Sequence, residues 1–256
     1  DGHQEVSTLP SIYFSQYFDH ETWGRIISDG WDEIVDRFIE IYEVLFDASS
    51  TKPIKGKSGK YIECFGQKEG MANLGKNKNE AIRVDKNTFR KELRKLINSE
   101  IELDAFNFFK LVHKAFNKAI FDSNYKKLIF YHIHNPSRYS QLNFIALAKK
   151  TKWLMLVREP IQSCESWLME FSEKVHYPHM ANRIFTMLFE IDNVIYQQQN
   201  SIGVRLEDLK ENPDKTIPAL CKWMGIKETK SLYEMTAQGK KWWGAPSSPD
   251  YSKDGM

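Results

Sequence analysis

The stretch "WLMLVREPIQSCESW", residues 153–167, changes from the pattern of a buried strand to that of a helix at a single arginine. Its five apolar residues, Trp153–Val157, are typical of a short buried β-strand. Pro160 suits the first position of a helix, where its missing N–H costs no hydrogen bond. Arg158 therefore lies between a strand and a helix amino terminus, where free amides and the helix dipole favour an anion. The stretch predicts an anion-binding turn at Arg158.

A hydroxyl follows this turn on the predicted helix. Ser166 lies about two helical turns beyond Arg158, so both can contact one anion only if that anion lies along the side of the helix. A second interpretation is a surface ion pair between Arg158 and Glu159, with Ser166 incidental. Spacing alone leaves both interpretations open.

Short apolar segments alternate with helical patterns through the second half of the chain. Their order predicts an α/β fold with three layers, in which helices cover both faces of a parallel sheet. Such sheets bind ligands beyond the carboxyl ends of their strands. The predicted strands are 127–133, 153–157 and 202–206, and the predicted helices are 31–46, 88–97, 103–121, 138–149, 161–171 and 180–199. The segment 49–86 has few apolar positions and is predicted to be a long excursion or lid.

Composition limits the partners and the compartment. The chain has 256 residues, 36 of them basic and 34 acidic, for a net charge of +2. This balance lacks the bulk basicity that non-specific nucleic-acid binding requires, so we expect no nucleic-acid partner and a local anion site. The 3 cysteines are far apart, which favours reducing, cytoplasmic surroundings. No apolar run approaches the roughly 18 residues of a membrane span.

Two histidines mark the end of the first of these predicted strands. In "YHIHNP", residues 131–136, His132 and His134 alternate with Ile133, so both imidazoles project from one side of an extended segment. Three roles fit this pattern: structural packing, a catalytic base near neutral pH, and a metal site completed by a distant ligand.

A late loop combines cations with aromatic planes. In "GKKWWG", residues 239–244, Lys240 and Lys241 precede two tryptophans. The combination suits a phosphorylated nucleotide, although a tryptophan pair is also typical of a protein core.

Taken in order, these segments resemble the sulfotransferase family that uses 3′-phosphoadenosine-5′-phosphosulfate as donor. Residues 154–168, "LMLVREPIQSCESWL", resemble the strand, turn and helix with which this family binds the donor's 3′-phosphate. The resemblance assigns that phosphate to Arg158 and Ser166. Residues 204–226, "VRLEDLKENPDKTIPALCKWMGI", are similar to the family's E-D-L segment and the helix after it. Leu206 stands where many members carry an adenine-contacting tyrosine.

The histidines and the late loop extend the resemblance. "HIHNP" resembles the family's K-T-H-x-P stretch, which places His134 on the catalytic base and His132 on the lysine. "GKKWWG" is similar to the loop that closes over the nucleotide, which makes Lys240 and Lys241 expected phosphate contacts. The family's P-x-S-G-T-T type donor loop occurs nowhere in the sequence, and the opening "DGHQEVSTLP" resembles the segment downstream of that loop. We therefore expect one sulfotransferase-like domain over residues 1–256, truncated at both ends.

The resemblance implies a nucleotide-kinase-like sulfotransferase fold and a donor nucleotide used as co-substrate without a metal. The sulfuryl group would pass to a hydroxyl or amine of a small-molecule, lipid or carbohydrate acceptor. Two alternatives stay open: a non-catalytic scaffold module of the same fold, favoured by the missing donor loop, and a metal-dependent hydrolase using His132 and His134. Neither the acceptor nor the oligomeric state follows from the sequence.

Overall fold

The computed structural model describes two compact units of the chain. The described residues are 2–9, 17–49, 54–55, 61–62, 69–133, 138–148, 150–171, 178, 181–182, 184–185 and 197–244. Unit 1 comprises Asp1–Leu147 and Thr229–Met256, and unit 2 comprises Ala148–Glu228.

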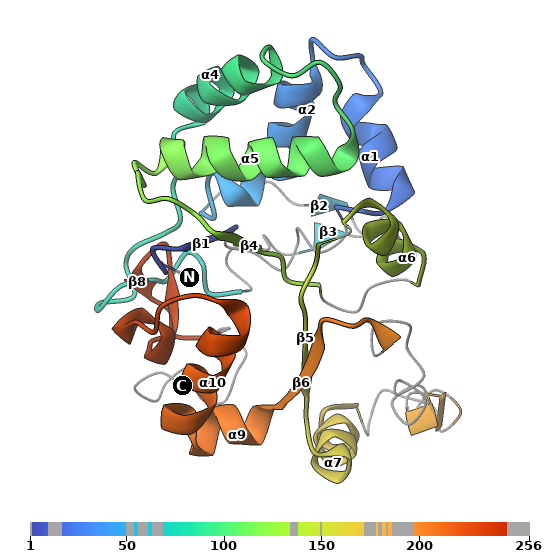
Figure 1. Ribbon diagram of the computed structural model, residues 1–256, viewed down its shortest axis with the longest axis vertical. Coiled ribbons are helices and arrows are strands. Elements are labelled where there is room, and N and C mark those ends of the chain that lie inside the picture. Colours follow the sequence, from blue (N-terminus) through green and yellow to red (C-terminus); the bar gives the residue numbers. More distant parts are fainter. Residues whose placement is uncertain are drawn as a thin grey trace. The chain divides into compact units, whose positions relative to one another are not determined.

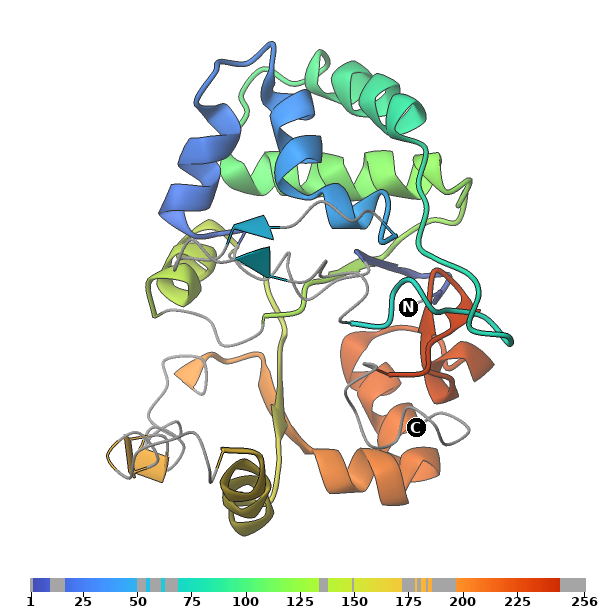
Figure 2. The ribbon, with the colours of Figure 1, turned by 180° about the vertical axis from the view of Figure 1, so that it is seen from behind.

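Helices dominate unit 1. They are α1 (His20–Ile27), α2 (Ile34–Ile41), α4 (Lys86–Ile97), α5 (Ala105–Ala119) and α6 (Arg138–Leu147). Helix α4 packs along α5, and α2 lies beside α4, in both views of the ribbon (Figures 1 and 2). The helices predicted at 88–97, 103–121 and 138–149 are confirmed as α4, α5 and α6, with ends moved by up to two residues.

Helix α5 is the centre of the unit 1 core. Its N-cap is Asp104, whose side chain accepts a hydrogen bond from the amide of Asn107. The apolar residues of the helix recur every three or four positions and so form one buried face. On that face Phe108 is fully buried, with ring centroids 5.7 Å from Phe38 of α2 and 5.7 Å from Trp23 of α1.

The helix predicted at 31–46 is interrupted. It consists of α2 and a short 3₁₀ helix, η2 (Glu43–Leu45), separated by Tyr42. Tyr42 has φ −113° and ψ 39°, outside the helical region, and its side chain is buried. The apolar pattern of 31–46 runs through this break, so periodicity alone predicts one continuous helix.

Short strands complete unit 1. Strand β1 (Val6–Thr8) pairs in parallel with β4 (Leu128–Phe130), which is shorter than the strand predicted at 127–133. Two antiparallel pairs are β2 (Ile54–Lys55) with β3 (Tyr61–Ile62), and β7 (Thr236–Ala237) with β8 (Lys240–Lys241). The β7–β8 hairpin packs on part of the segment 49–86, in a small core of Ala48, Leu74, Ile82 and Ala237 flanked by Met71 and Trp242.

The described part of unit 2 contains one parallel strand pair. Strand β5 (Trp153–Val157) pairs with β6 (Ser201–Arg205), and the helix α7 (Pro160–Phe171) follows β5. Helices α9 (Leu206–Glu211) and α10 (Pro213–Met224) follow β6 (Figure 1). These elements confirm the strand–helix alternation predicted around residues 153 and 202. The helix predicted at 180–199 lies mostly outside the described residues.

The fold is therefore of the mixed α/β kind, with small parallel sheets. Both parallel pairs, β1–β4 and β5–β6, have two strands. Among the described helices, none has the length and apolarity that crossing a bilayer demands.

Candidate functional site

Two arginines lie at the carboxyl ends of the parallel strands of unit 2. Strand register pairs Val157 at the end of β5 with Arg205 at the end of β6. Arg158 follows Val157 directly, so both arginines lie at the same edge of the strand pair. Both side chains are exposed to solvent. Together with the carboxylates of Glu159 and Glu207, these arginines form a cluster that we call the strand-end site.

Glu207, in the first turn of α9, links the two strand ends. Its Oε1 accepts a hydrogen bond of 3.0 Å from the backbone N–H of Glu159, and its Oε2 lies 3.7 Å from Nε of Arg205. The backbone hydrogen bond from Glu159 is the main cause that lowers the pKa of Glu207, and the positive charges of Arg205 and Arg158 lower it further. Glu207 is therefore ionised at neutral pH.

Carboxylates of the protein occupy part of the amino terminus of α7. Besides the bond between Glu207 and the Glu159 amide, Oε2 of Glu159 accepts a 2.6 Å hydrogen bond from the backbone N–H of Gln162. The sequence-based prediction that free amides await an anion at this terminus is wrong for these two amides. The positively charged groups at this edge are instead the guanidinium groups of Arg158 and Arg205.

Ser166 lies on an exposed part of α7. With a helical rise of about 1.5 Å per residue, it is about 9 Å beyond Pro160 along the helix axis. An anion contacted by both Arg158 and Ser166 would therefore have to lie along the side of α7.

The other predicted site residues belong to unit 1. His132 is exposed and follows β4, whereas His134 lies outside the described residues. Lys240 and Lys241 form β8. Within the described part of the chain, no group of three or more His, Cys, Asp and Glu side chains is placed to hold a metal ion.

Side-chain contacts anchor the loop that carries the two lysines. Nζ of Lys240 donates a 3.1 Å hydrogen bond to the carbonyl oxygen of Ala81 and lies 3.3 Å from a carboxylate oxygen of Glu80. Nζ of Lys241 lies 3.6 Å from the ring centroid of Trp243. The indole N–H of Trp243 donates to the carbonyl of Gly75 at 2.6 Å. The ammonium group of Lys240 is therefore already engaged by Ala81 and Glu80.

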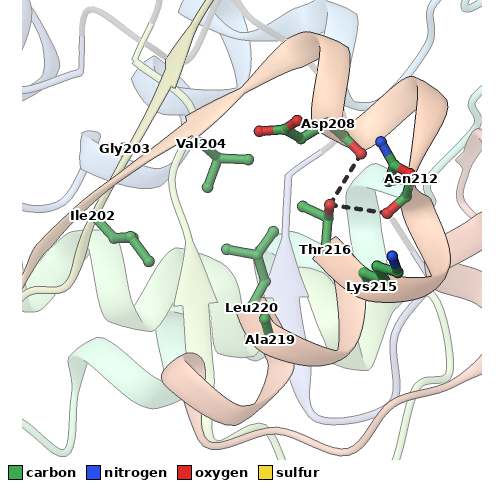
Figure 3. Close-up of a pocket in the computed structure, with 9 residues that line it drawn as sticks. All are labelled: Ile202, Gly203, Val204, Asp208, Asn212, Lys215, Thr216, Ala219 and Leu220. Carbon is green, nitrogen blue, oxygen red and sulfur yellow. Dashed lines mark hydrogen bonds between the residues drawn. The ribbon is translucent and has the colours of Figure 1, made fainter.

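A pocket of about 500 Å³ opens beside β6 in unit 2 (Figure 3). Ile202, Val204 and Leu220 supply apolar side chains, and Val204 and Leu220 point into the same space between the strand and α10. Thr216 forms part of its polar rim, with Oγ1 at 3.0 Å from the carbonyl oxygen of Asp208 and 2.9 Å from that of Asn212. The pocket borders the strand that ends at Arg205.

Sequence reasoning missed two members of the strand-end site, Arg205 and Glu207. Both stand in "VRLED", residues 204–208, for which the sequence suggested no site residue. A signal was present, because a charged residue at the last position of an apolar strand points to a site at the sheet edge. Placing Arg205 beside Arg158 required the pairing register of β5 and β6, which the sequence does not contain.

Comparison with known proteins finds little similarity. No protein-family model matches the chain, and no curated protein matches it. Among solved structures, the chain is similar to a sulfotransferase domain from the curacin biosynthetic pathway, with 17% sequence identity and a TM-score of 0.37. The match covers 58% of this chain and 59% of that domain. A similarity of this size carries no functional argument.

Proposed function

We propose that the chain is a sulfotransferase built on the three-layer parallel sheet of that family, and that its strand-end site binds the 3′-phosphate of 3′-phosphoadenosine-5′-phosphosulfate. One observation carries the proposal: Arg158 and Arg205 stand at neighbouring carboxyl ends of two parallel strands. Guanidinium groups match phosphate oxygens in a bidentate fashion, and each charge-assisted hydrogen bond is worth about 1.5–3 kcal/mol.

The charges at this site favour a strongly charged anion. The positive charges of Arg158 and Arg205 are balanced by the carboxylates of Glu159 and Glu207, which both accept backbone hydrogen bonds. A weakly charged anion gains little from a balanced cluster. A phosphate monoester, with nearly two negative charges at neutral pH, gains more from the exposed guanidinium groups. The residues present therefore fit a terminal phosphate.

The chemistry follows from the resemblance of residues 131–136. The donor supplies an activated sulfuryl group to an acceptor hydroxyl or amine and leaves as adenosine 3′,5′-bisphosphate. His134 would take the proton of the acceptor as the new bond to sulfur forms and the bond to the bridging oxygen breaks. A general base of this kind contributes about 10²–10⁴-fold to the rate. His132 would help to balance the charge on the departing oxygen.

Lys240 and Lys241 are proposed as further phosphate contacts. For Lys240 this role requires its ammonium group to leave Glu80 and Ala81 and to contact the nucleotide instead. The acceptor would be a small molecule, a lipid or a carbohydrate.

The test compares two nucleotides that differ in the 3′-phosphate. Adenosine 3′,5′-bisphosphate and 5′-AMP are titrated against the chain while its thermal stability is followed, since a ligand at 100 times its Kd stabilises the folded state by about 2.7 kcal/mol. We expect only the bisphosphate to stabilise the chain. Arg158→Gln and Arg205→Gln should each weaken that effect, whereas Lys210→Gln, at an exposed position of α9, should leave it unchanged. Equal stabilisation by both nucleotides would refute the proposed phosphate role.

A second candidate is a non-catalytic scaffold module of the same fold. It is favoured by the carboxylates that already accept hydrogen bonds from the amides of Glu159 and Gln162. Under this alternative neither nucleotide changes the thermal stability. The third alternative, a metal-dependent hydrolase that uses His132 and His134, predicts a stoichiometric metal in the purified protein, which elemental analysis measures directly.

A further inference from the structure

Glu207 joins two turns that are distant in sequence. Its carboxylate and the amide of Glu159 are 48 residues apart along the chain and 3.0 Å apart in space. One turn leads from β5 into α7 and carries Arg158, and the other leads from β6 into α9 and starts at Arg205. The hydrogen bond is therefore a direct connection between the backbones that carry the two arginines.

The two oxygens of Glu207 have different surroundings. Oε1 accepts the bond from Glu159, whereas Oε2 is buried and has no hydrogen-bond partner among the described residues. Nε of Arg205 lies 3.7 Å from Oε2, beyond hydrogen-bond distance. The side chain as a whole is 15% exposed, so water screens its charge less than that of a surface carboxylate.

We propose that Glu207 is a positioning residue that also sets the anion affinity of the strand-end site. Its Oε1 ties the β5–α7 turn to the β6–α9 turn, so that Arg158 and Arg205 face the same anion. Its negative charge opposes anion binding and so lowers the affinity of the two arginines for a phosphate. This inference rests on the proposed phosphate-binding function and deepens it.

Two substitutions distinguish the positioning role of Glu207 from its charge role. Glu207→Gln keeps an oxygen that accepts the Glu159 amide and removes the charge. Glu207→Ala removes both. Glu211→Gln is the matched control, because it removes one negative charge from an exposed position of the same helix.

The experiment has two readouts on the 256-residue chain. One is the hydrogen-exchange rate of the Glu159 amide, measured by NMR, which reports the link between the turns without any ligand. The other is the Kd for adenosine 3′,5′-bisphosphate. Loss of a hydrogen bond worth about 1.4 kcal/mol should speed exchange in Glu207→Ala about tenfold. Removal of the carboxylate charge beside the anion should tighten binding in Glu207→Gln about fivefold, with exchange unchanged.

The outcomes distinguish this inference from the function on which it rests. Exchange at Glu159 that stays within about twofold of wild type in Glu207→Ala would overturn the positioning role. Bisphosphate binding by Glu207→Gln that is no tighter than binding by Glu211→Gln would overturn the charge role. Bisphosphate binding by Glu207→Ala that is as tight as binding by Glu207→Gln would overturn the positioning role, because these two variants differ only in the hydrogen bond to the Glu159 amide. If exchange accelerates as expected but wild type binds no bisphosphate, the phosphate function fails and the link between the turns stands.

Discussion

The hydroxyl oxygen of Ser7 lies 2.9 Å from Nδ1 of His113, which connects strand β1 to the buried face of helix α5. His113 is fully enclosed in unit 1, with its ring centroid 4.7 Å from that of Phe109. Burial disfavours the imidazolium form and lowers the pKa of His113 from 6.5 to about 3. His113 is therefore a neutral core residue.

This pKa makes the stability of the chain depend on pH. Between the unfolded pKa near 6.5 and the folded pKa of about 3, the unfolded state binds the extra proton. The contribution of neutral His113 is therefore complete above about pH 6.5 and falls as the pH decreases, with a slope of up to about 1.4 kcal/mol per pH unit. Urea unfolding between pH 4 and 7 measures the slope. In His113→Gln this part of the slope should vanish, and parallel pH profiles for the two proteins would contradict the assignment.

Phe108 should be among the costliest core positions to truncate. It is fully buried on α5 between Phe38 and Trp23. Phe108→Ala leaves a cavity that its neighbours fill only partly, so we expect a loss of about 3–5 kcal/mol of unfolding free energy. Tyr125→Ala is the control, since its side chain is 83% exposed and should change stability by less than about 0.5 kcal/mol. Urea denaturation of both variants makes the comparison, and a small effect at Phe108 would place it outside a packed core.

Two glycines should respond to alanine in opposite directions. Gly70 has φ +72°, and a Cβ there would collide with the carbonyl oxygen of Gly244. Gly70→Ala should therefore destabilise the chain by roughly 1–3 kcal/mol. Gly24 lies inside α1, and a Cβ added there would meet no atom of the surrounding structure within 4 Å, so Gly24→Ala should stabilise by about 0.5–1 kcal/mol. Thermal unfolding of the two variants should move the midpoint in opposite directions; a shift of the same sign would be inconsistent with this geometry.

The positive charges of the strand-end site should affect the pKa of Glu207. Because its folded pKa is lowered, its contribution to stability is present above the unfolded pKa of about 4.3 and is lost as the pH falls through the folded pKa. Arg205→Gln removes one of the charges that lower the pKa, so the pKa of Glu207 should rise toward its ordinary value. Carboxyl carbon NMR follows this titration. Lys210→Gln removes a charge from the same helix and should have no such effect, and an equal rise in both variants would show only a general charge effect.

Local sequence patterns predicted the longer elements of the described chain, such as α4, α5, α7, β5 and β6, but not the helix α1 or the shortest strands. The apolar run 153–157 and the proline at 160 identified β5 and the start of α7, because strand propensity and helix initiation depend on neighbouring residues. The same reasoning did not predict β1, whose three residues are too few to show a period, and it missed the break at Tyr42. The sequence predicted that Lys240 contacts a nucleotide. Its contact with Glu80 could not be predicted, because the two residues are far apart in the sequence.

By itself, the sequence determined that an arginine follows a short apolar strand just before a helix, since hydrophobic pattern and proline placement act over a few residues. The burial predicted for this strand is wrong in part, because Leu156 of β5 is 59% exposed. Only the tertiary structure decided that Arg205 stands beside it and that Glu207 binds the amide of Glu159. These relationships depend on strand register and on contacts between residues 48 positions apart, which form only when the chain packs.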